Sequence, residues 1–193
     1  ALQRDDLVFG TYRSHALFLA KTDDTDKFLA ELYGKATGSQ RGKAGSMHLA
    51  LPEKGVITTS AVVGTTIPVA AGAALANKFL KNKKITVSFF GDGAIDEGVF
   101  WESLNFASLK KLPILFVCED NNLAIHSAVN ERWGHEPLVE VASRFYCHVK
   151  ESDTTDVFEI YKITREMIGK MKRTKKPGLL HLKYYRYLEH VGV

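Results

Sequence analysis

Phe90-Gly91-Asp92-Gly93-Ala94 closes one apolar run of this chain, and Asn121-Asn122 follows a second apolar run. A glycine-rich turn lets the backbone approach phosphate groups, while a carboxylate and an amide oxygen suit a hard divalent cation. The 27 residues between Gly93 and Asn121 match the length of one helix and one return strand in a βαβ unit. We therefore expect both polar segments at the carboxyl ends of neighbouring strands, where open α/β sheets bind ligands.

The composition is that of an ordinary globular protein. The chain has 193 residues, 45% hydrophobic and 25% charged, and its formal charge of +4 comes from 26 basic and 22 acidic residues. Much of the basic excess lies in residues 81–84 and 162–176, which we interpret as solvated helix and turn surfaces. No aromatic residue interleaves the first of these runs, so we expect no nucleic-acid partner. A role toward an acidic protein partner stays open.

The two cysteines, Cys118 and Cys147, do not form a disulfide framework. Cys118 ends the apolar run of residues 114–118, which predicts a buried, reduced thiol. No stretch has the apolar length needed to cross a bilayer, so no membrane partner is expected. The chain opens on Ala1 without a methionine or a signal-like stretch, and we expect it to be an internal piece of a longer protein.

Hydrophobic periodicity predicts an α/β fold with a mostly parallel sheet and helices on both faces. Residues 1–193 are expected to form a single domain. The first third is less regular, with one helix at residues 25–33 and a Gly-, Ser- and Lys-rich loop at 38–48. The core stripe predicted for the last helix is Val157, Ile160, Ile163 and Met167. After residue 65 the predicted helices are 66–80, 99–110, 137–145 and 156–171, and the predicted strands are 84–90, 114–118, 146–149 and 179–184.

Asp92 is the first candidate for site chemistry. Alone, an aspartate between two glycines is a common turn former. Together with Asn121 at the end of the next predicted strand, it favours a magnesium site, with the backbone carbonyl of Leu123 as a third oxygen ligand. Asn122 is an alternative ligand or a turn former.

Tyr12 and Arg13 form a second candidate cluster. The planar guanidinium of Arg13 suits a phosphate group, and Tyr12 offers a hydroxyl donor. A surface arginine in an ion pair explains the same residues equally well. The simplest interpretation of His190, near the end of the sequence, is that it is an exposed histidine without a role in the site.

A series of short segments along the chain carries recognisable motifs: residues 11–15 (TYRSH), 42–48 (GKAGSMH), 63–68 (VGTTIP), 91–94 (GDGA), 111–113 (KLP), 118–121 (CEDN), 185–187 (YRY) and His190. In these segments the chain resembles the α subunit of the E1 component of the 2-oxo acid dehydrogenases, which depend on thiamine diphosphate. Only the spacing from Gly-Asp-Gly to Asn is a strong motif by itself, but together the segments are specific, and they follow the family's order.

The resemblance implies a thiamine diphosphate-binding fold and a role at each matching position. Asp92 and Asn121 would bind magnesium through their side chains and Leu123 through its carbonyl. His190 would be the catalytic residue, on a loop at the mouth of the site where it contacts the diphosphate or the substrate. The implied diphosphate contacts are Tyr12, Arg13, Gly93, Ala94 and Asn121, and the implied aminopyrimidine contacts are Val63 and Ala61.

The resemblance also implies partners. In this family a β subunit supplies the pyrimidine-binding half of the site in an α2β2 heterotetramer, and a lipoyl-bearing E2 core accepts the acyl group formed from a 2-oxo acid. The expected compartment is the cytoplasm, with the mitochondrial matrix as the alternative. The sequence stops at Val193, inside the loop that covers the cofactor in this family, and we expect a cofactor-free site in which that loop is mobile.

Several positions depart from the family pattern. Ala44 and Ala61 stand where glycines are usual, Leu123 replaces a common tyrosine, and Leu188-Glu189 replaces His-Gly. Val191 stands where some members carry a regulatory serine. The departures concern substrate preference and regulation, whereas the metal and diphosphate positions match.

Two alternatives remain. One is another thiamine diphosphate half-subunit, of the acetoin dehydrogenase or transketolase-like kind. The other is a non-catalytic scaffold that keeps the fold, although a scaffold has no need to retain Tyr12, Arg13, Asp92 and Asn121 together. A dinucleotide-binding domain is disfavoured because no G-x-G-x-x-G opens a helix.

Overall fold

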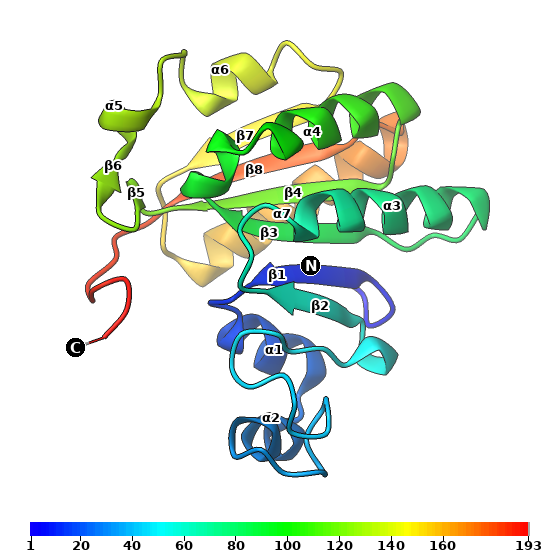
Figure 1. The fold of residues 1–193 in the computed structure, drawn as a ribbon. Coiled ribbons are helices and arrows are strands. Elements are labelled where there is room, and N and C mark those ends of the chain that lie inside the picture. The colour runs from blue at the N-terminus through cyan, green and yellow to red at the C-terminus, as the bar shows by residue number, and fades with distance from the viewer. Residues whose placement is uncertain (193) are drawn as a thin grey trace.

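A computed structural model describes residues 1–192 of the chain, and its centre is a sheet of six parallel strands (Figure 1). The order across the sheet is β2-β1-β3-β4-β8-β7, and every adjacent pair is parallel. The strands are β1 (Leu7–Thr11), β2 (Val56–Ser60), β3 (Thr86–Gly91), β4 (Ile114–Asp120), β7 (His148–Ser152) and β8 (Gly178–Lys183). A separate antiparallel pair, β5 (Leu123–Ala124) and β6 (Ser127–Ala128), follows β4.

Helices cover both faces of this sheet, as Figure 1 shows. One core includes side chains of α3 (Thr66–Phe79), α4 (Gly98–Lys110) and α6 (Leu138–Ala142). The core on the opposite face includes side chains of α1 (His15–Thr22), α2 (Thr25–Leu32) and α7 (Val157–Thr174). The short elements are the 3-10 turns η1 (Pro52–Lys54) and η2 (Asp92–Asp96) and the helix α5 (Val129–Arg132).

Strand β4 explains why the sheet needs two covering layers. Successive side chains of a strand point to opposite faces. Ile114, Phe116 and Cys118 belong to the core under α3 and α4, while Leu115 and Val117 belong to the core under α7. A strand buried on both faces is a continuous apolar run, which is typical of parallel sheets.

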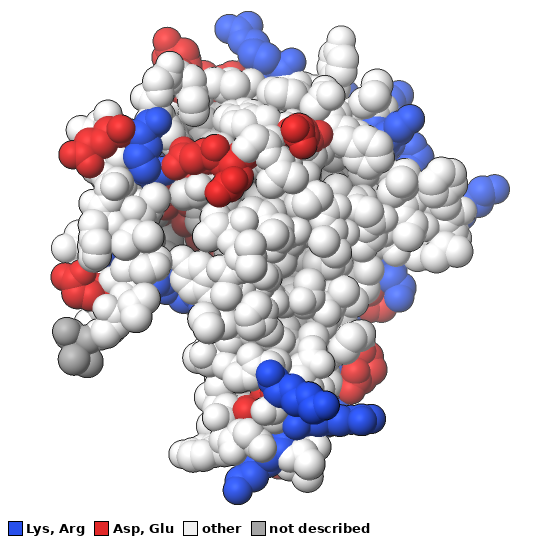
Figure 2. All heavy atoms as spheres, in the orientation of Figure 1, with Lys and Arg blue, Asp and Glu red and all other residues white. Residues whose placement is uncertain are grey.

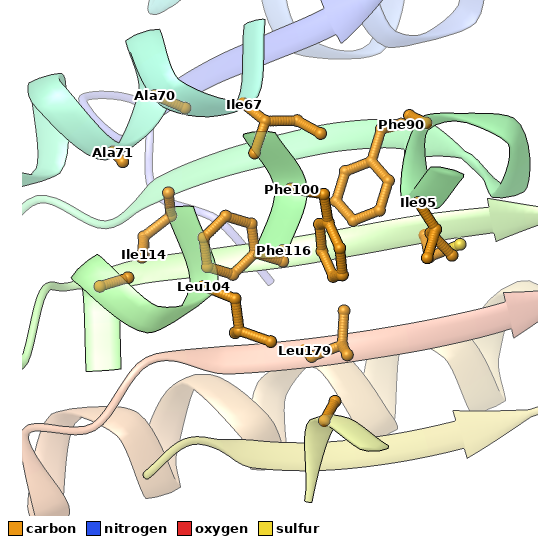
Figure 3. Packing of buried hydrophobic residues seen from close by; sticks show 14 of the residues in the cluster. Ile67, Ala70, Ala71, Phe90, Ile95, Phe100, Leu104, Ile114, Phe116 and Leu179 are labelled. Atoms are coloured by element: carbon orange, nitrogen blue, oxygen red, sulfur yellow. The ribbon is translucent and has the colours of Figure 1, made fainter. Parts of the chain in front are cut away.

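An aromatic cluster joins the sheet to the helix that follows β3. Phe90 of β3 and Phe100 of α4 have ring centroids 5.1 Å apart, and both rings contact Phe116 of β4 (Figure 3). All three side chains are at most 1% exposed. Packing of this kind fixes α4 over β3 and β4, and thereby fixes the turn that connects β3 to α4.

The predicted α/β fold is confirmed, and the predicted elements after residue 65 are all present with shifted ends. The helix expected at 137–145 is shorter, because α6 covers only Leu138–Ala142. The predicted core position Val157 is wrong, since its side chain is 69% exposed at the first turn of α7, and the buried residues of that helix are Met167, Ile168 and Met171. Strands β1 and β2 and helix α1 were not predicted.

Within residues 1–192, no helix is long and apolar enough to cross a membrane. The cofactor-covering loop predicted at the end of the sequence includes Val193, which lies outside the described residues.

Candidate functional site

The carboxyl ends of β1, β3 and β4 border a cavity of about 410 Å³. Ends of neighbouring parallel strands meet at one edge of the sheet, so the turns that leave these strands surround a common space. The lining also includes residues of the β2–α3 connection, Glu97 before α4, residues 123–125 after β4, and Tyr184 and His190 after β8. Figure 2 shows acidic side chains gathered above a hollow on the side of the molecule where α5 and β6 lie.

The structure brings nearly all of the predicted site residues to this cavity. Ala61 is the exception, because it does not line the cavity although its neighbours Ser60 and Val62 do. The glycine-rich segment at 42–48 also lies elsewhere. The predicted residues that line the cavity are Tyr12, Arg13, Val63, Asp92, Gly93, Ala94, Asn121, Leu123 and His190.

Asp92 begins the turn η2 and is 1% exposed. Its Oδ2 accepts a hydrogen bond of 2.5 Å from Nη2 of Arg132, and Nη1 of the same arginine donates to Asp96. Burial raises the pKa of Asp92 and the nearby carboxylate of Asp120 raises it further, while Arg132 acts in the opposite direction. The site therefore concentrates negative charge that a cation stabilises, and Arg132 supplies that positive charge here.

Asn121 and Leu123 lie where β4 turns away from the sheet. Oδ1 of Asn121 accepts a hydrogen bond of 3.0 Å from the Leu123 backbone N–H, and Nδ2 donates to the Tyr184 hydroxyl at 3.2 Å. Asn122 between them has a φ of 67°, a left-handed conformation that asparagine tolerates. Asn122 is therefore the turn former of the two alternatives, and it does not line the cavity.

Glu119 faces the cavity from β4 and was not predicted to have a role of its own. Its side chain is exposed toward the cavity and lies between the buried residues Cys118 and Asp120. Burial raises the pKa of Glu119 to about 7, and the positive charge of Arg13 lowers it. A carboxyl group that titrates near neutrality thus lies beside the arginine proposed to bind phosphate.

The segment after β8 crosses the mouth of the cavity and is tied to both sides. Nη2 of Arg13 donates to the backbone carbonyl of His190 at 2.9 Å, and the rings of Tyr12 and His190 meet edge to face at 5.8 Å. Nη2 of Arg186 donates to the carbonyl of Ile125 at 2.9 Å. These contacts hold residues 184–190 across the cavity.

The loop at 38–48 is organised by a buried carboxylate outside the cavity. Glu31 of α2 is 0% exposed, and its two oxygens accept backbone hydrogen bonds from Gln40, Gly42 and Ala44 at 2.6, 3.0 and 2.7 Å. The backbone carbonyl of Ser46 in this loop lies within hydrogen-bond distance of Nε2 of His15, at 3.1 Å. The loop therefore lies along α1 and α2.

Several residues of the site carried no recognisable sequence signal. Arg132 reaches Asp92 across 40 positions of the chain, and Tyr184 reaches Asn121 across 63. Ile125 has a φ of 58° at the tip between β5 and β6. Among the site residues that were not predicted, Glu119 alone could have been identified from the sequence, because it lies inside the matched segment at 118–121.

Comparison with known proteins gives a consistent result. The family profile described as "Dehydrogenase E1 component" matches residues 1–192. The α subunit of acetoin:2,6-dichlorophenolindophenol oxidoreductase from Bacillus subtilis is 33% identical over 189 residues, which are 98% of this chain and 57% of that protein. The chloroplastic pyruvate dehydrogenase E1 component subunit alpha-3 of Arabidopsis thaliana is 34% identical and is matched over 98% of this chain and 46% of its own length.

A solved structure supports the fold. The X-ray structure of a "putative thiamin diphosphate-dependent enzyme" from Mycobacterium smegmatis superposes with a TM-score of 0.57 at 18% identity, covering 96% of this chain and 30% of that one. At this identity the likeness shows the fold alone. The chain spans about half the length of the curated relatives it matches.

Proposed function

The chain belongs to the dehydrogenase E1 component family, and from this premise we propose that it is the α-type subunit that holds the diphosphate and magnesium of thiamine diphosphate. The proposed reaction is the oxidative decarboxylation of a 2-oxo acid with acyl transfer to a lipoyl-bearing E2 core. The observation that carries the proposal is the cavity at the carboxyl ends of β1, β3 and β4, which Arg13, Asp92 and Asn121 line together.

The donor chemistry of the cavity fits magnesium. Asp92 would supply a carboxylate oxygen, Asn121 an amide oxygen and Leu123 a backbone carbonyl, which are the oxygen ligands that Mg²⁺ prefers. The raised pKa of Asp92 reflects burial and the nearby Asp120, and a divalent cation would offset both effects. Arg132 would have to release Asp92 for the metal to bind, because its guanidinium now occupies the carboxylate.

The remaining lining residues suit the organic part of the cofactor. Arg13 and Tyr12 would hold the diphosphate through the guanidinium and the hydroxyl, and Gly93 and Ala94 through backbone groups. Val63, with Ala61 beside it in the chain, would approach the aminopyrimidine. His190 would contact the diphosphate or the substrate at the mouth of the cavity. Its backbone carbonyl accepts a hydrogen bond from Arg13.

The bound cofactor would supply a carbon nucleophile and an electron sink for the loss of carbon dioxide. The residues of this chain would bind and orient it, and the segment at 184–190 would help to exclude water from the reacting centre. Glu119 would hold or release a proton near neutral pH beside Arg13, since its pKa is raised to about 7.

The proposed partners follow from the family. A β subunit would complete the site in an α2β2 heterotetramer and supply the pyrimidine-binding half. The E2 core would accept the acyl product. The proposed compartment is the cytoplasm, with the mitochondrial matrix as the alternative, and localisation of the tagged full-length protein tests this choice.

Acetoin cleavage is the second candidate function. The relative from Bacillus subtilis carries acetoin in its name, and its identity of 33% is close to the 34% of the pyruvate dehydrogenase relative. Overall similarity therefore does not separate the two substrates. A transketolase-like half-subunit or a scaffold is less well supported, because the family profile is that of the E1 dehydrogenases and the charged lining of the cavity is retained.

Calorimetric titration of thiamine diphosphate tests the proposal, with and without Mg²⁺ and with and without a candidate β subunit. We expect metal-dependent binding that Asp92→Ala abolishes and that Glu102→Gln, an exposed change on α4, leaves unaltered. The absence of metal-dependent binding in both settings would contradict the proposal. A panel of 2-oxo acids and acetoin, followed with a redox dye, then identifies the substrate.

A further inference from the structure

A second cavity lies at the opposite end of the sheet from the candidate site. It has a volume of about 560 Å³ and is lined by residues that precede β3 and β4, among them Ile85 and Pro113. The seven residues of β4 separate the two ends by roughly 20 Å. Figure 2 shows lysine and arginine side chains projecting from the edge of the molecule where α3 and α4 end.

This basic pocket unites the two lysine-rich runs of the sequence. Three helices end at it from both layers of the fold, since Lys81 follows α3, Lys111 caps α4 and Lys175 caps α7, each with a φ between 49° and 58°. No aspartate, glutamate, arginine or aromatic residue lines it. The eight lysines of the lining are Lys78, Lys81, Lys83, Lys84, Lys111, Lys172, Lys175 and Lys176.

The positive charge exceeds what the helices themselves require. A helix C-terminus carries about half a negative charge, so three of them offset roughly 1.5 of the eight lysine charges. Within residues 1–192, none of these lysines forms a salt bridge; Lys78 donates instead to the Lys110 carbonyl at 2.5 Å. About six positive charges therefore remain for an external anion.

The pKa of His148, at the start of β7, is affected by positive charges at this end of the sheet. Burial lowers the pKa of His148, and the positive charges of Lys176, Lys170 and Arg173 lower it further. Positive charges at this end of the sheet therefore act on His148 in the same direction as burial.

The floor of the pocket is apolar. Ile85, Leu112 and Met171 form its base and are at most 3% exposed, so the apolar surface within reach of a ligand comes from Pro113 and from the methylene stems of the lysines. A rim of flexible ammonium groups over an apolar floor suits a ligand that combines several carboxylates with an apolar side chain. The volume admits side chains of a docked segment.

The residue types that line the basic pocket indicate which kind of polyanion it would bind. Tight phosphate sites use arginine forks or helix N-termini, and single-stranded nucleic acids use aromatic stacking platforms. Among the described residues, this pocket has neither an arginine fork nor a helix N-terminus, and its flexible lysines reach beyond the helix C-termini, whose carbonyls repel any anion held close to them. We infer that the basic pocket is a docking surface for an acidic segment of a partner polypeptide that carries an apolar anchor residue.

The test uses the full chain and a fluorescein-labelled synthetic peptide in which glutamates flank a central leucine. Binding is measured by fluorescence anisotropy at several salt concentrations. The variant replaces Lys83, Lys84, Lys172 and Lys176 by glutamine, which spares the lysines with left-handed φ. The matched control replaces four exposed lysines elsewhere by glutamine: Lys35, Lys54, Lys150 and Lys162.

We expect salt-sensitive binding that weakens about tenfold or more in the pocket variant and less than about twofold in the control, because each exposed ion pair contributes modestly. Absence of binding, or an equal loss in both variants, would overturn the inference. So would tighter binding of duplex DNA or inorganic tripolyphosphate than of the peptide. Unchanged melting temperatures and thiamine diphosphate titrations show that fold and cofactor site are intact, so this test stands apart from the proposed function.

Discussion

Arg132 and Asp92 form an ion pair of 2.5 Å inside the candidate site, although 40 positions separate them in the chain. Arg132 comes from α5, beyond the β5–β6 pair, and its side chain is 12% exposed. The same guanidinium binds Asp96, and Asp96 also accepts a hydrogen bond of 2.9 Å from Trp133. The arginine thus couples the position of α5 to the carboxylate proposed to bind magnesium.

Arg132→Met should strengthen metal binding and weaken the free protein. Magnesium and the guanidinium compete for Asp92, so removing the arginine should tighten Mn²⁺ binding in the presence of thiamine diphosphate by about tenfold. The free energy of unfolding of the metal-free chain should fall by about 3 kcal/mol, because Asp92 is left buried without a partner. Electron paramagnetic resonance of free Mn²⁺ measures the first effect and urea unfolding the second.

Arg132→Lys is the matched control, since it keeps the charge but loses the fork that spans Asp92 and Asp96. It should give an intermediate metal affinity. Metal binding that is unchanged or weaker in Arg132→Met would show that the arginine does not compete with the metal.

His181→Phe should destabilise the chain by about 3 kcal/mol. His181 of β8 is 2% exposed and lies between Asp120, with 2.7 Å between Nε2 and Oδ2, and Glu151, with 2.8 Å between Nδ1 and Oε2. Burial opposes ionisation of Asp120, but hydrogen bonds from His181 and from the Asn122 backbone hold the pKa of Asp120 below its usual value. Phenylalanine would leave Oδ2 of this buried carboxylate without its hydrogen bond from His181, while Oδ1 would keep the bond from the Asn122 backbone.

Glu151→Gln serves as the control for His181. Glu151 is more exposed and also pairs with Lys183 at 3.0 Å, so its neutral replacement should cost only about 1 kcal/mol. Urea unfolding at neutral pH measures both variants. Equal losses of unfolding free energy in the two variants would mean that the Asp120–His181 contact does not stabilise the chain more than the His181–Glu151 contact does.

The sheet was predictable where strands are buried on both faces. Strands β3 and β4 appear as continuous apolar runs, and the turn after β3 carries glycines that mark its end. Strands β1 and β2 were missed because each has five residues, with Gly10 in the first and three hydroxyl residues in the second. Their strand conformation depends on pairing with each other and with β3 more than on local preference.

The candidate site was predictable from the sequence to about the same extent as the sheet. The spacing of Asp92 and Asn121 follows from the length of a strand–helix–strand unit, so their meeting at adjacent strand ends could be predicted. Contacts of Arg132 and Tyr184 depend on where loops return to the sheet, and no local pattern encodes that return. The basic pocket is a similar case, since its lysines come from the ends of three helices.

Neither cysteine should react readily in the native chain. Burial, followed by the carboxylates of Asp120 and Asp92, raises the pKa of Cys118 well above its usual value. Burial raises the pKa of Cys147 to about 11, against the opposing charge of Lys176. Because the thiolate is the nucleophile, both thiols should react with a disulfide reagent at about pH 8 at least 100-fold more slowly than in the denatured chain.

A Thr155→Cys variant supplies the reference for that experiment, because Thr155 is exposed. It should show one fast-reacting thiol on an otherwise slow background. Rapid modification of a wild-type thiol in the folded chain would mean that its side chain is not buried in solution.

Acid should loosen the loop at 38–48 through Glu31. Burial opposes ionisation of this carboxylate, but backbone hydrogen bonds from Ala44, Gln40 and Gly42 outweigh it and hold the pKa of Glu31 below its usual value. A lowered pKa in the folded state means that the stabilisation is present above the unfolded pKa and is lost as the pH falls through the folded pKa. Thermal unfolding from about pH 6 to pH 3 should therefore show a fall in stability at the acid end.

Glu31→Gln identifies the source of that fall. An amide has one acceptor oxygen and turns its NH2 group toward backbone donors, so it cannot replace a carboxylate that accepts three backbone hydrogen bonds with both oxygens. The variant should lose roughly 3 kcal/mol at neutral pH and show a shallower decline toward pH 3. Glu102→Gln, an exposed change on α4, is the matched control and should retain the wild-type decline. If Glu31→Gln and wild type lost stability in parallel with falling pH, Glu31 would not be the titrating group.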